Sequence, residues 1–180
     1  MGHRLSKIVT RTGDVGTSGL ADGTRLPKTH PRFAAMGDVD ELNALLGVLL
    51  SQVRPDQLTR VLRPIQHHLF NLGGELAMPG QALIREDHIA TLEAALEALN
   101  ADLPPLKEFV LPTGPTVVAS AHHARAVCRR AERAVWVVLA EDNNASRLAA
   151  IYLNRLSDLL FVIARHLSRD VNPQEQTWQI

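Results

Sequence analysis

Apolar residues recur at helical spacing in five stretches of this chain, separated by clusters of proline, glycine and polar residues. The first stretch begins at Asp38, which with Glu41 three residues later has the pattern of a helix-capping box, and it ends at Pro55. The second runs from Pro55 to the break at residues 78–80, and the third spans about residues 86–100. The pattern predicts three helices here.

Two longer amphipathic stretches follow. One begins at Pro115 and ends at residues 142–144, and the other covers about residues 146–168, before a polar tail that begins at residues 172–173. Residues 109–115 precede these helices and include prolines that limit hydrogen bonding in a sheet, and no partner strand is visible for them. We interpret this segment as an ordered loop with an apolar anchor.

Five helices with short connections and no convincing strand predict an all-α fold, a five-helix antiparallel bundle of the ferritin-like up-down kind. The chain has 180 residues, of which 46% are hydrophobic, and this suits a single domain with one core. Within that domain we expect a mostly extended segment at residues 1–37, the bundle at 38–170 and a tail at 171–180.

A glycine- and hydroxyl-rich segment ahead of the bundle, residues 10–19, is a candidate nucleotide-binding loop. Gly13, Gly16 and Gly19 let backbone amides turn toward an anion, because glycine adopts positive φ at little steric cost. The other polar residues supply hydroxyl groups, one cation and one hard oxygen ligand: Thr10, Thr12, Thr17, Ser18, Arg11 and Asp14. These groups suit a polyphosphate carrying Mg²⁺.

The loop has neither the P-loop pattern nor the dinucleotide-binding pattern, which must open a helix after a strand. Residues 21–31 follow it and contain two prolines, so we expect extended coil, in which Lys28 is the one residue whose charge can return to a phosphate. A flexible surface loop is the alternative interpretation of residues 10–19.

Polar side chains on the predicted fourth helix form a second candidate site. Their spacing places them on one helix face: Arg125, Arg129, Glu132, Arg133 and Trp136. Arginine outnumbers the acids there, and its planar guanidinium matches phosphate oxygens in pairs. A solvated, salt-bridged helix surface is the alternative.

Two further helix faces carry polar groups. Asn154 and Asp158 lie one turn apart on the fifth helix and form either a polar face or a nucleotide clamp. Asp40, Asn43 and Gly47 lie on one side of the first helix, where a glycine indicates close approach of another surface.

Composition excludes several classes of protein. The 19 basic and 19 acidic residues give a formal net charge of zero, and aromatics are 4%, so neither nucleic acid nor an anionic membrane is an expected partner. No apolar run is long enough for a membrane span, and the single cysteine, Cys128, does not indicate an oxidising compartment, so we expect a cytoplasmic protein. The histidine pairs at 67–68 and 122–123 are adjacent and point apart on a helix, so no histidine metal site is expected.

Several segments together closely resemble the PduO-type ATP:cob(I)alamin adenosyltransferases, the corrinoid adenosyltransferases that make adenosylcobalamin. The segments follow the family's order: TRTGDVGTSGLADG (10–23), PK (27–28), GDVDELNALLG (37–47), LFNLGGELA (69–77), FVLPTG (109–114), CRRAERAV (128–135) and YLNRLSDLLFVIAR (152–165). They span nearly the whole chain.

The resemblance implies a five-helix bundle that forms a homotrimer, with active sites between adjacent subunits that bind ATP with Mg²⁺ on one side and the corrinoid on the other. It implies that Mg²⁺ is bound mainly through the ATP phosphates. The residues implied to hold ATP are Thr10, Arg11, Thr12, Gly13, Asp14, Gly16, Thr17, Ser18, Lys28, Arg129, Arg130, Glu132, Arg133 and Asn154.

Three residues are implied at the corrinoid side. Asp40 and Arg125 would form an ion pair between subunits, and Phe109 would be an apolar wedge over the lower face of the corrin. The wedge would exclude the lower axial ligand and leave four-coordinate Co(II), which is easier to reduce. Val15 and Thr113 depart from the family's pattern, where a charged residue and a glycine are usual, and bear on the charge of the first loop and the backbone after Phe109.

The implied activity is transfer of the 5′-deoxyadenosyl group of ATP to Co(I) of cobalamin or a related corrinoid, which releases triphosphate. Co(I) is a strong nucleophile that needs no general base, so alignment and stabilisation of the leaving triphosphate are the expected tasks, and Arg129 is a candidate catalytic residue. A cob(II)alamin reductase and an adenosylcobalamin-dependent enzyme are further expected partners. A nucleotide-responsive binding protein without transferase activity and a purely structural bundle are the alternatives.

Overall fold

Five helices and one short antiparallel sheet make up the part of the chain that the structure, a computed structural model, describes: residues 8–54, 57–142, 145–171 and 175–179. The elements are β1 (Thr17–Gly19), β2 (Arg25–Pro27), α1 (Pro31–Leu50), α2 (Gln57–Ala77), α3 (Glu86–Asn100), α4 (Thr116–Glu141) and α5 (Leu148–Val171). The predicted helical bundle is confirmed.

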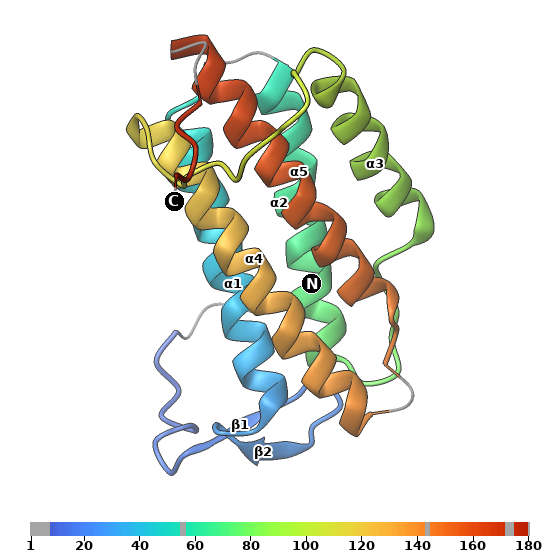
Figure 1. The fold of residues 1–180 in the computed structure, drawn as a ribbon. Coiled ribbons are helices and arrows are strands. Elements are labelled where there is room, and N and C mark those ends of the chain that lie inside the picture. The colour runs from blue at the N-terminus through green and yellow to red at the C-terminus, as the bar shows by residue number, and fades with distance from the viewer. Residues whose placement is uncertain (1–7, 55–56, 143–144, 172–174, 180) are drawn as a thin grey trace.

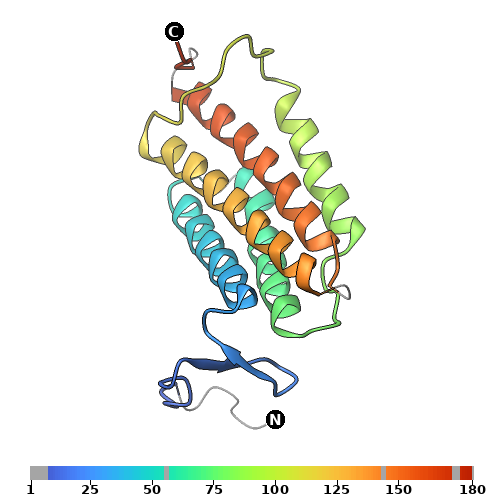
Figure 2. The same cartoon turned by 60° about the horizontal axis from the view of Figure 1, so that its bottom comes forward.

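Helix α4 packs against both α1 and α5, while α2 packs against α1 and α3 against α5 (Figure 1). The β1–β2 hairpin lies beyond the end of the bundle where α1 begins, and the C-terminus lies at the other end (Figure 2). None of the helices in the described residues is long and apolar enough to cross a membrane.

The core is built from the apolar stripes of the helices, and small residues bring α4 close to its neighbours. Ala121, Ala124, Cys128 and Ala131 are fully buried on α4. The leucines of α5 that are fully buried are Leu153, Leu156, Leu159 and Leu160. Because small side chains on one helix leave room for large ones on the next, α4 is held closely, and its opposite face is free to carry charge.

Helix α1 begins at Pro31, so the prediction of a start at Asp38 is wrong. His30 is the N-cap, and its Nδ1 accepts a hydrogen bond from the N–H of Arg32 at 3.2 Å. Proline fits the first position of a helix because its φ is already helical and its missing N–H has no partner there. Asp38 lies inside the helix, where it pairs with Arg130 of α4. The extended N-terminal segment is correspondingly shorter.

A β-hairpin joins the end of the N-terminal loop to the segment predicted as extended coil, residues 21–31. Strands β1 and β2 pair antiparallel, with Ser18 opposite Leu26 and Gly19 opposite Arg25. Gly23, in the connection, has a φ of 88°, a conformation that glycine adopts without strain. Strands of three residues are too short for a visible alternating pattern, so the sequence did not reveal them.

The loop at residues 109–115 has the strand partner that the sequence did not reveal. Val110 forms an isolated antiparallel bridge with Thr177 in the C-terminal tail. The predicted breaks at Pro55, at residues 143–144 and at residues 172–173 lie outside the described residues.

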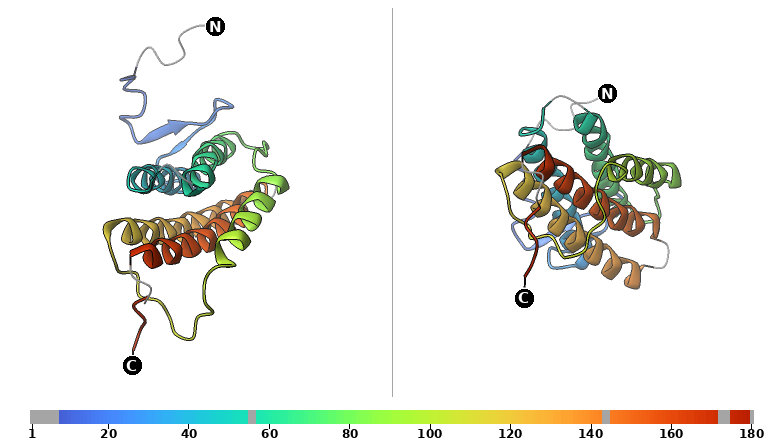
Figure 3. Two further views of the ribbon diagram at one scale, coloured as in Figure 1. Left: turned by 90° about the horizontal axis from the view of Figure 1, so that it is seen from above. Right: turned by 45° about the horizontal axis from the view of Figure 1, so that its top comes forward.

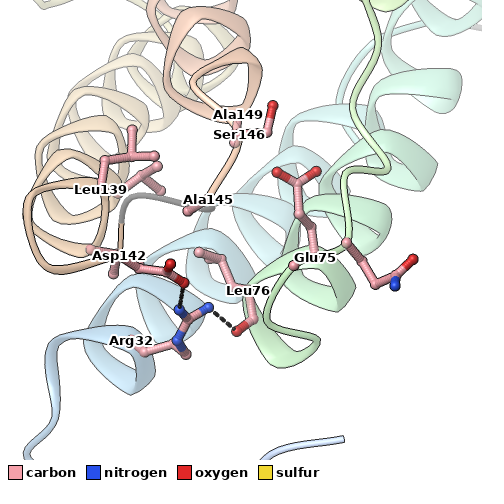
Figure 4. A pocket seen from close by; sticks show the side chains of 12 residues that line it. Arg32, Glu75, Leu76, Leu139, Asp142, Ala145, Ser146 and Ala149 are labelled. Atoms are coloured by element: carbon pink, nitrogen blue, oxygen red, sulfur yellow. Dashed lines mark hydrogen bonds and ion pairs between the residues drawn. The ribbon is translucent and has the colours of Figure 1, made fainter. Parts of the chain in front are cut away.

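Arg32, in the first turn of α1, bonds the ends of α2 and α4 (Figure 4). Its guanidinium donates to the carbonyl of Leu76, near the end of α2, at 2.9 Å, and to the carboxylate of Asp142, which caps α4, at 2.6 Å. The Arg32 side chain is 7% exposed and that of Asp142 21%. A buried charge of this kind is stable only with such partners.

We expect Arg32→Met to lower the free energy of unfolding by about 3 kcal/mol, because it removes one member of a largely buried ion pair and the donor to Leu76. Urea denaturation followed by circular dichroism measures this. Arg85→Met is the control, because the ion pair of Arg85 with Asp87 is exposed to solvent. Its loss should leave the urea midpoint nearly unchanged. Equal midpoints for the two variants would contradict the assigned role of Arg32.

Candidate functional site

Turns and one left-handed glycine shape the N-terminal loop, residues 10–19. The N–H of Gly16 donates to the carbonyl of Gly13 at 3.2 Å, and Gly16 has a φ of 79°, as predicted. The same prediction is wrong for Gly13 and Gly19, whose φ is not positive. Arg11 takes the left-handed conformation instead, with a φ of 60°, which is uncommon for a residue with a side chain.

Gly13 lies against Lys28, whose side chain would have to shift slightly to admit a Cβ atom at position 13. A Cβ atom at Gly13 would be 3.0 Å from Nζ of Lys28 and 3.1 Å from its Cε. The N–H of Lys28 donates to the carbonyl of Gly16 at 2.9 Å, which holds the lysine beside the loop. The exposed ammonium group therefore lies over the turn, where it adds positive charge to the loop.

Arg25, on β2, contacts the N-terminal loop, and the sequence did not reveal this role. From β2 its guanidinium donates to the carbonyl of Thr12 at 2.7 Å and to the carbonyl and Oγ1 of Thr17 at 3.1 and 2.9 Å. Thr12 is also hydrogen-bonded to Thr10 through their hydroxyls at 3.0 Å. Arg25 thus fixes the shape of the loop, and only the hairpin brings it there, so no local spacing revealed it.

Three arginines of α4, Arg125, Arg129 and Arg133, succeed one another at four-residue spacing; we call them the arginine row. None of them makes an ion pair within the described part of the chain. Like charges one turn apart on a helix repel each other. An anion bound beside the row would offset this repulsion, so the row is a candidate anion site.

Arg125 is the most enclosed member of the row. Its Nε is buried without a hydrogen-bond partner, and its guanidinium lies 5.9 Å from the ring centre of Phe161 on α5. Burial, followed by the charge of Arg129, lowers the pKa of Arg125 from its usual value. The side chain is therefore short of an acceptor or a negative charge.

Glu132 joins the row to α5. Its carboxylate accepts hydrogen bonds from Nδ2 of Asn154 at 3.4 and 3.5 Å and from Nε1 of Trp136 at 3.3 Å. Glu132 and Asn154, both predicted as ATP ligands, thus lie together beside Arg129 and Arg133 on α4.

Other predicted residues are engaged elsewhere. Arg130 faces α1, where it pairs with Asp38 at 3.0 Å and also with Glu41. Asp158 pairs with Arg155, which in turn bonds Glu93 of α3 at 2.7 Å, so this part of α5 is a salt-bridged polar face.

Phe109 and Arg125, both predicted at the corrinoid side, line one pocket of about 410 Å³ together with Lys107 and Phe161. The Phe109 side chain is 79% exposed. Covering an exposed aromatic ring with an apolar surface removes it from water, which is favourable. This ring is therefore available to cover an apolar ligand surface.

The backbone after Phe109 accommodates the unusual threonine. Thr113 does not adopt positive φ, and its N–H donates to the carbonyl of Leu111 at 2.8 Å. Gly114 is the residue with positive φ, at 138°. The threonine therefore fits its position without left-handed strain. Val15, the other departure, is 84% exposed.

Asp40 lies on a different surface, at a pocket of about 560 Å³ between α1 and α2. Phe70 in this pocket is 74% exposed, and Gly37, Gly73 and Gly74 leave it open. Within one chain Asp40 and Arg125 line separate pockets, and the ion pair predicted for them, which joins two subunits, stays a prediction. We call residues 33–43 and 69–77 that line this pocket the α1–α2 face.

His68 and His88 take structural roles. Nδ1 of His68 lies 3.1 Å from the hydroxyl of buried Tyr152, and its ring stacks on that of His88 at 4.1 Å. Burial lowers the pKa of His68. Among the described residues no group of three or more histidine, cysteine or acidic side chains has the arrangement of a metal site.

The sequence of this chain is similar to those of known adenosyltransferases that act on corrinoids. Residues 8–167 match the family model described as cobalamin adenosyltransferase. A cobalamin adenosyltransferase of Cupriavidus metallidurans is 51% identical over 99% of this chain and 97% of its own length. A corrinoid adenosyltransferase of Mycobacterium tuberculosis H37Rv is 46% identical over 94% of this chain and 93% of its own length.

Solved structures agree as well. A PduO-type ATP:corrinoid adenosyltransferase of Lactobacillus reuteri, in a phenylalanine-to-alanine variant complexed with cobalamin and ATP, superposes with a TM-score of 0.89 at 30% identity, covering 97% of this chain and all of that one. An arginine-to-lysine variant complexed with ATP gives 0.87 at 31% identity, covering 96% of this chain and all of that one. With its helical bundle, arginine row and loop, this chain therefore belongs to the cobalamin adenosyltransferase family and is of the PduO type.

Proposed function

We propose that this protein binds Mg-ATP at the arginine row and the N-terminal loop and transfers its 5′-deoxyadenosyl group to Co(I) of cobalamin or a related corrinoid, releasing triphosphate. Adenosyl transfer to a corrinoid is the activity of its family. The observation that carries the placement of ATP is the arginine row, which has no ion-pair partner in the described chain, so that a bound anion would offset the repulsion between its charges.

The triphosphate is assigned first to Arg129 and Arg133, the exposed members of the row, with Asn154 and Glu132 beside them. Two guanidinium groups one turn apart can each bind phosphate oxygens in pairs. Arg130 is assigned second, because its guanidinium already pairs with Asp38 and Glu41. The row stabilises the negative charge that grows on the triphosphate as it leaves.

The loop contributes backbone amides, hydroxyls and the Lys28 ammonium group to the same triphosphate. Asp14 fits a phosphate-bound Mg²⁺, because its carboxylate is exposed among the hydroxyls of the loop and Mg²⁺ prefers hard oxygen ligands. When bound, Mg²⁺ supplies positive charge that neutralises the phosphates.

A homotrimer would bring these groups together. In one chain the α1–α2 face carries a carboxylate without an ion pair, Asp40, and an exposed Phe70, whereas α4 carries Arg125, whose Nε has no hydrogen-bond partner. Opposite charges and an apolar patch suit packing of this face on α4 of a neighbouring subunit. Because the hairpin continues directly into α1 at Pro31, the same packing would bring the N-terminal loop of one subunit close to the arginine row of the next.

The proposed reaction requires alignment of Co(I) with C5′ of ATP rather than proton transfer. Co(I) attacks C5′ of the ribose, the C5′–O bond breaks, and the electron pair leaves with the triphosphate, so no general base is needed. Cys128 takes no part, because it is buried, its thiol donates to the Leu153 carbonyl at 3.1 Å, and burial raises its pKa. The remaining requirement is reduction of Co(II) to Co(I). We assign Phe109 to this step, as the apolar wedge at the lower face of the corrin that excludes the lower axial ligand.

The test is an anaerobic absorbance assay with purified protein, Mg-ATP and chemically reduced cob(I)alamin. Equal amounts of adenosylcobalamin and triphosphate are the expected products. ATP binding without a cobalt–carbon product would favour the nucleotide-responsive binding protein, and absence of any thermal stabilisation by ATP would favour a purely structural bundle. A cytoplasmic location, a cob(II)alamin reductase partner and an adenosylcobalamin-dependent partner stay predictions.

Phe109→Ala is expected to lower turnover with cob(II)alamin and a reductant at least about tenfold, because the lower axial ligand is then no longer excluded. The dissociation constant for ATP, measured by calorimetry, is expected to stay nearly unchanged. Val48→Ala is the control for ATP binding, since it removes an exposed apolar side chain of α1 outside the α1–α2 face. Equal losses in ATP binding and in turnover would count against the wedge.

Arg129→Ala is expected to weaken ATP binding about tenfold or more, because a charge-assisted contact to phosphate contributes roughly 1.5–3 kcal/mol. Isothermal titration calorimetry with Mg-ATP measures this. Arg85→Ala is the control, an exposed arginine at the start of α3. An unchanged dissociation constant would remove Arg129 from the triphosphate site.

Asp40→Arg is expected to shift the protein from trimer toward monomer in analytical ultracentrifugation, because it would set like charges against each other at the proposed subunit contact. The double variant with Arg125→Asp is expected to recover part of the trimer. Glu97→Arg, a charge reversal at an exposed position of α3, is the control and should stay trimeric. Identical sedimentation of Asp40→Arg and Glu97→Arg would rule out the proposed contact.

A further inference from the structure

A buried ion pair joins α5 to the C-terminal tail. Nε of Arg165 donates to one carboxylate oxygen of Glu175 at 2.8 Å, and a terminal nitrogen donates to the other at 2.9 Å. The two side chains are 5% and 8% exposed. The same terminal nitrogen donates to the carbonyl of Pro104 at 2.8 Å. Arg165 therefore holds both the tail and the start of the loop that carries Phe109.

The tail also pairs with this loop beside Phe109 itself. The N–H of Trp178 donates to the carbonyl of Phe109 at 2.8 Å, and the N–H of Leu111 donates to the carbonyl of Gln176 at 2.9 Å. Tail and loop lie side by side at one end of the bundle (Figure 3). The backbone of Phe109 is thus held directly by the tail.

Phe109 is 79% exposed, so packing against the protein does not fix the position of its side chain. Its direction depends on backbone bonds to either side. A buried ion pair is a weak source of stability, because the cost of removing two charges from water offsets most of their attraction, but it fixes one geometry where its hydrogen bonds are complete. The arrangement suits a positioning role.

We propose that the C-terminal tail, anchored by Arg165 and Glu175, positions Phe109 for the corrinoid. The tail acts through two attachments, the ion pair behind the loop and the short bridge at residues 109–111. Arg165, Glu175 and the Trp178 backbone are positioning groups and need not touch substrate. The proposal rests on the wedge role of Phe109 proposed above.

Two variants break the two attachments separately. Glu175→Ala removes the ion pair, and Trp178→Pro removes the N–H that binds the Phe109 carbonyl. Thr177→Pro is the matched control for the second variant. Val110 and Thr177 are the residues between the two bridge hydrogen bonds, so the N–H of Thr177 lies outside the ladder and proline is tolerated there.

The first measurement is hydrogen exchange of the Leu111 amide in the free protein. Exchange is expected to be faster in Glu175→Ala and Trp178→Pro than in the wild type and Thr177→Pro, since the bond from Leu111 to Gln176 depends on the tail. Unchanged exchange in both variants would overturn the anchoring role. This measurement needs no substrate, so it stands even if the proposed adenosyl transfer fails.

The second measurement separates positioning from general damage. Both variants should lose about tenfold or more in turnover from cob(II)alamin with a reductant, and lose the spectroscopic signature of four-coordinate Co(II), while KM for ATP and turnover from supplied cob(I)alamin change little. Equal losses with cob(I)alamin and cob(II)alamin would indicate a merely structural tail and overturn the proposal, as would faster exchange with unchanged turnover. Absence of transfer from cob(I)alamin in the wild type would instead refute the proposed function.

Discussion

The close packing of α4 between α1 and α5 is the constraint on which the rest of the structure depends. Fully buried alanines and Cys128 on α4 leave room for the leucines of α5, so the helix cannot rotate without opening a void or a clash. Because a helix is rigid over this length, fixing one face fixes the opposite one. The arginine row is thereby aligned along α4 in a single direction.

The arrangement leaves charge unbalanced where substrate is expected. Arg125, Arg129 and Arg133 repel one another, and Arg125 lies partly buried with an unpaired Nε. Neighbouring Arg130 shows the contrast, since it turns to α1 and pairs with Asp38 and Glu41. One helix thus separates a structural cation, Arg130, from the cations that we assign to an anionic ligand, and the difference arises from which side of α4 each residue faces.

Three other arginines hold the polypeptide where helical packing cannot reach it. Arg25 donates to the Thr12 and Thr17 carbonyls in the N-terminal loop, Arg32 to the Leu76 carbonyl at the end of α2, and Arg165 to the Pro104 carbonyl before Phe109. In each case a guanidinium binds backbone oxygens of a loop or helix end and a second partner at once. The two loops assigned to substrate are therefore both held from outside themselves.

Local patterns in the sequence determined the five helices, the common face of Arg125, Arg129 and Arg133, and the glycine and hydroxyl content of the N-terminal loop, because helical periodicity depends only on near neighbours. They did not determine where α1 starts, since a proline after a histidine fits the end of a coil as well as a helix N-terminus. Only the tertiary structure decided that Arg25 stabilises the loop, that Asp40 and Arg125 lie on separate surfaces of one chain, and that the tail binds the backbone of Phe109. These relations join residues far apart in the chain or depend on which side of a helix is buried, and no short-range spacing encodes them.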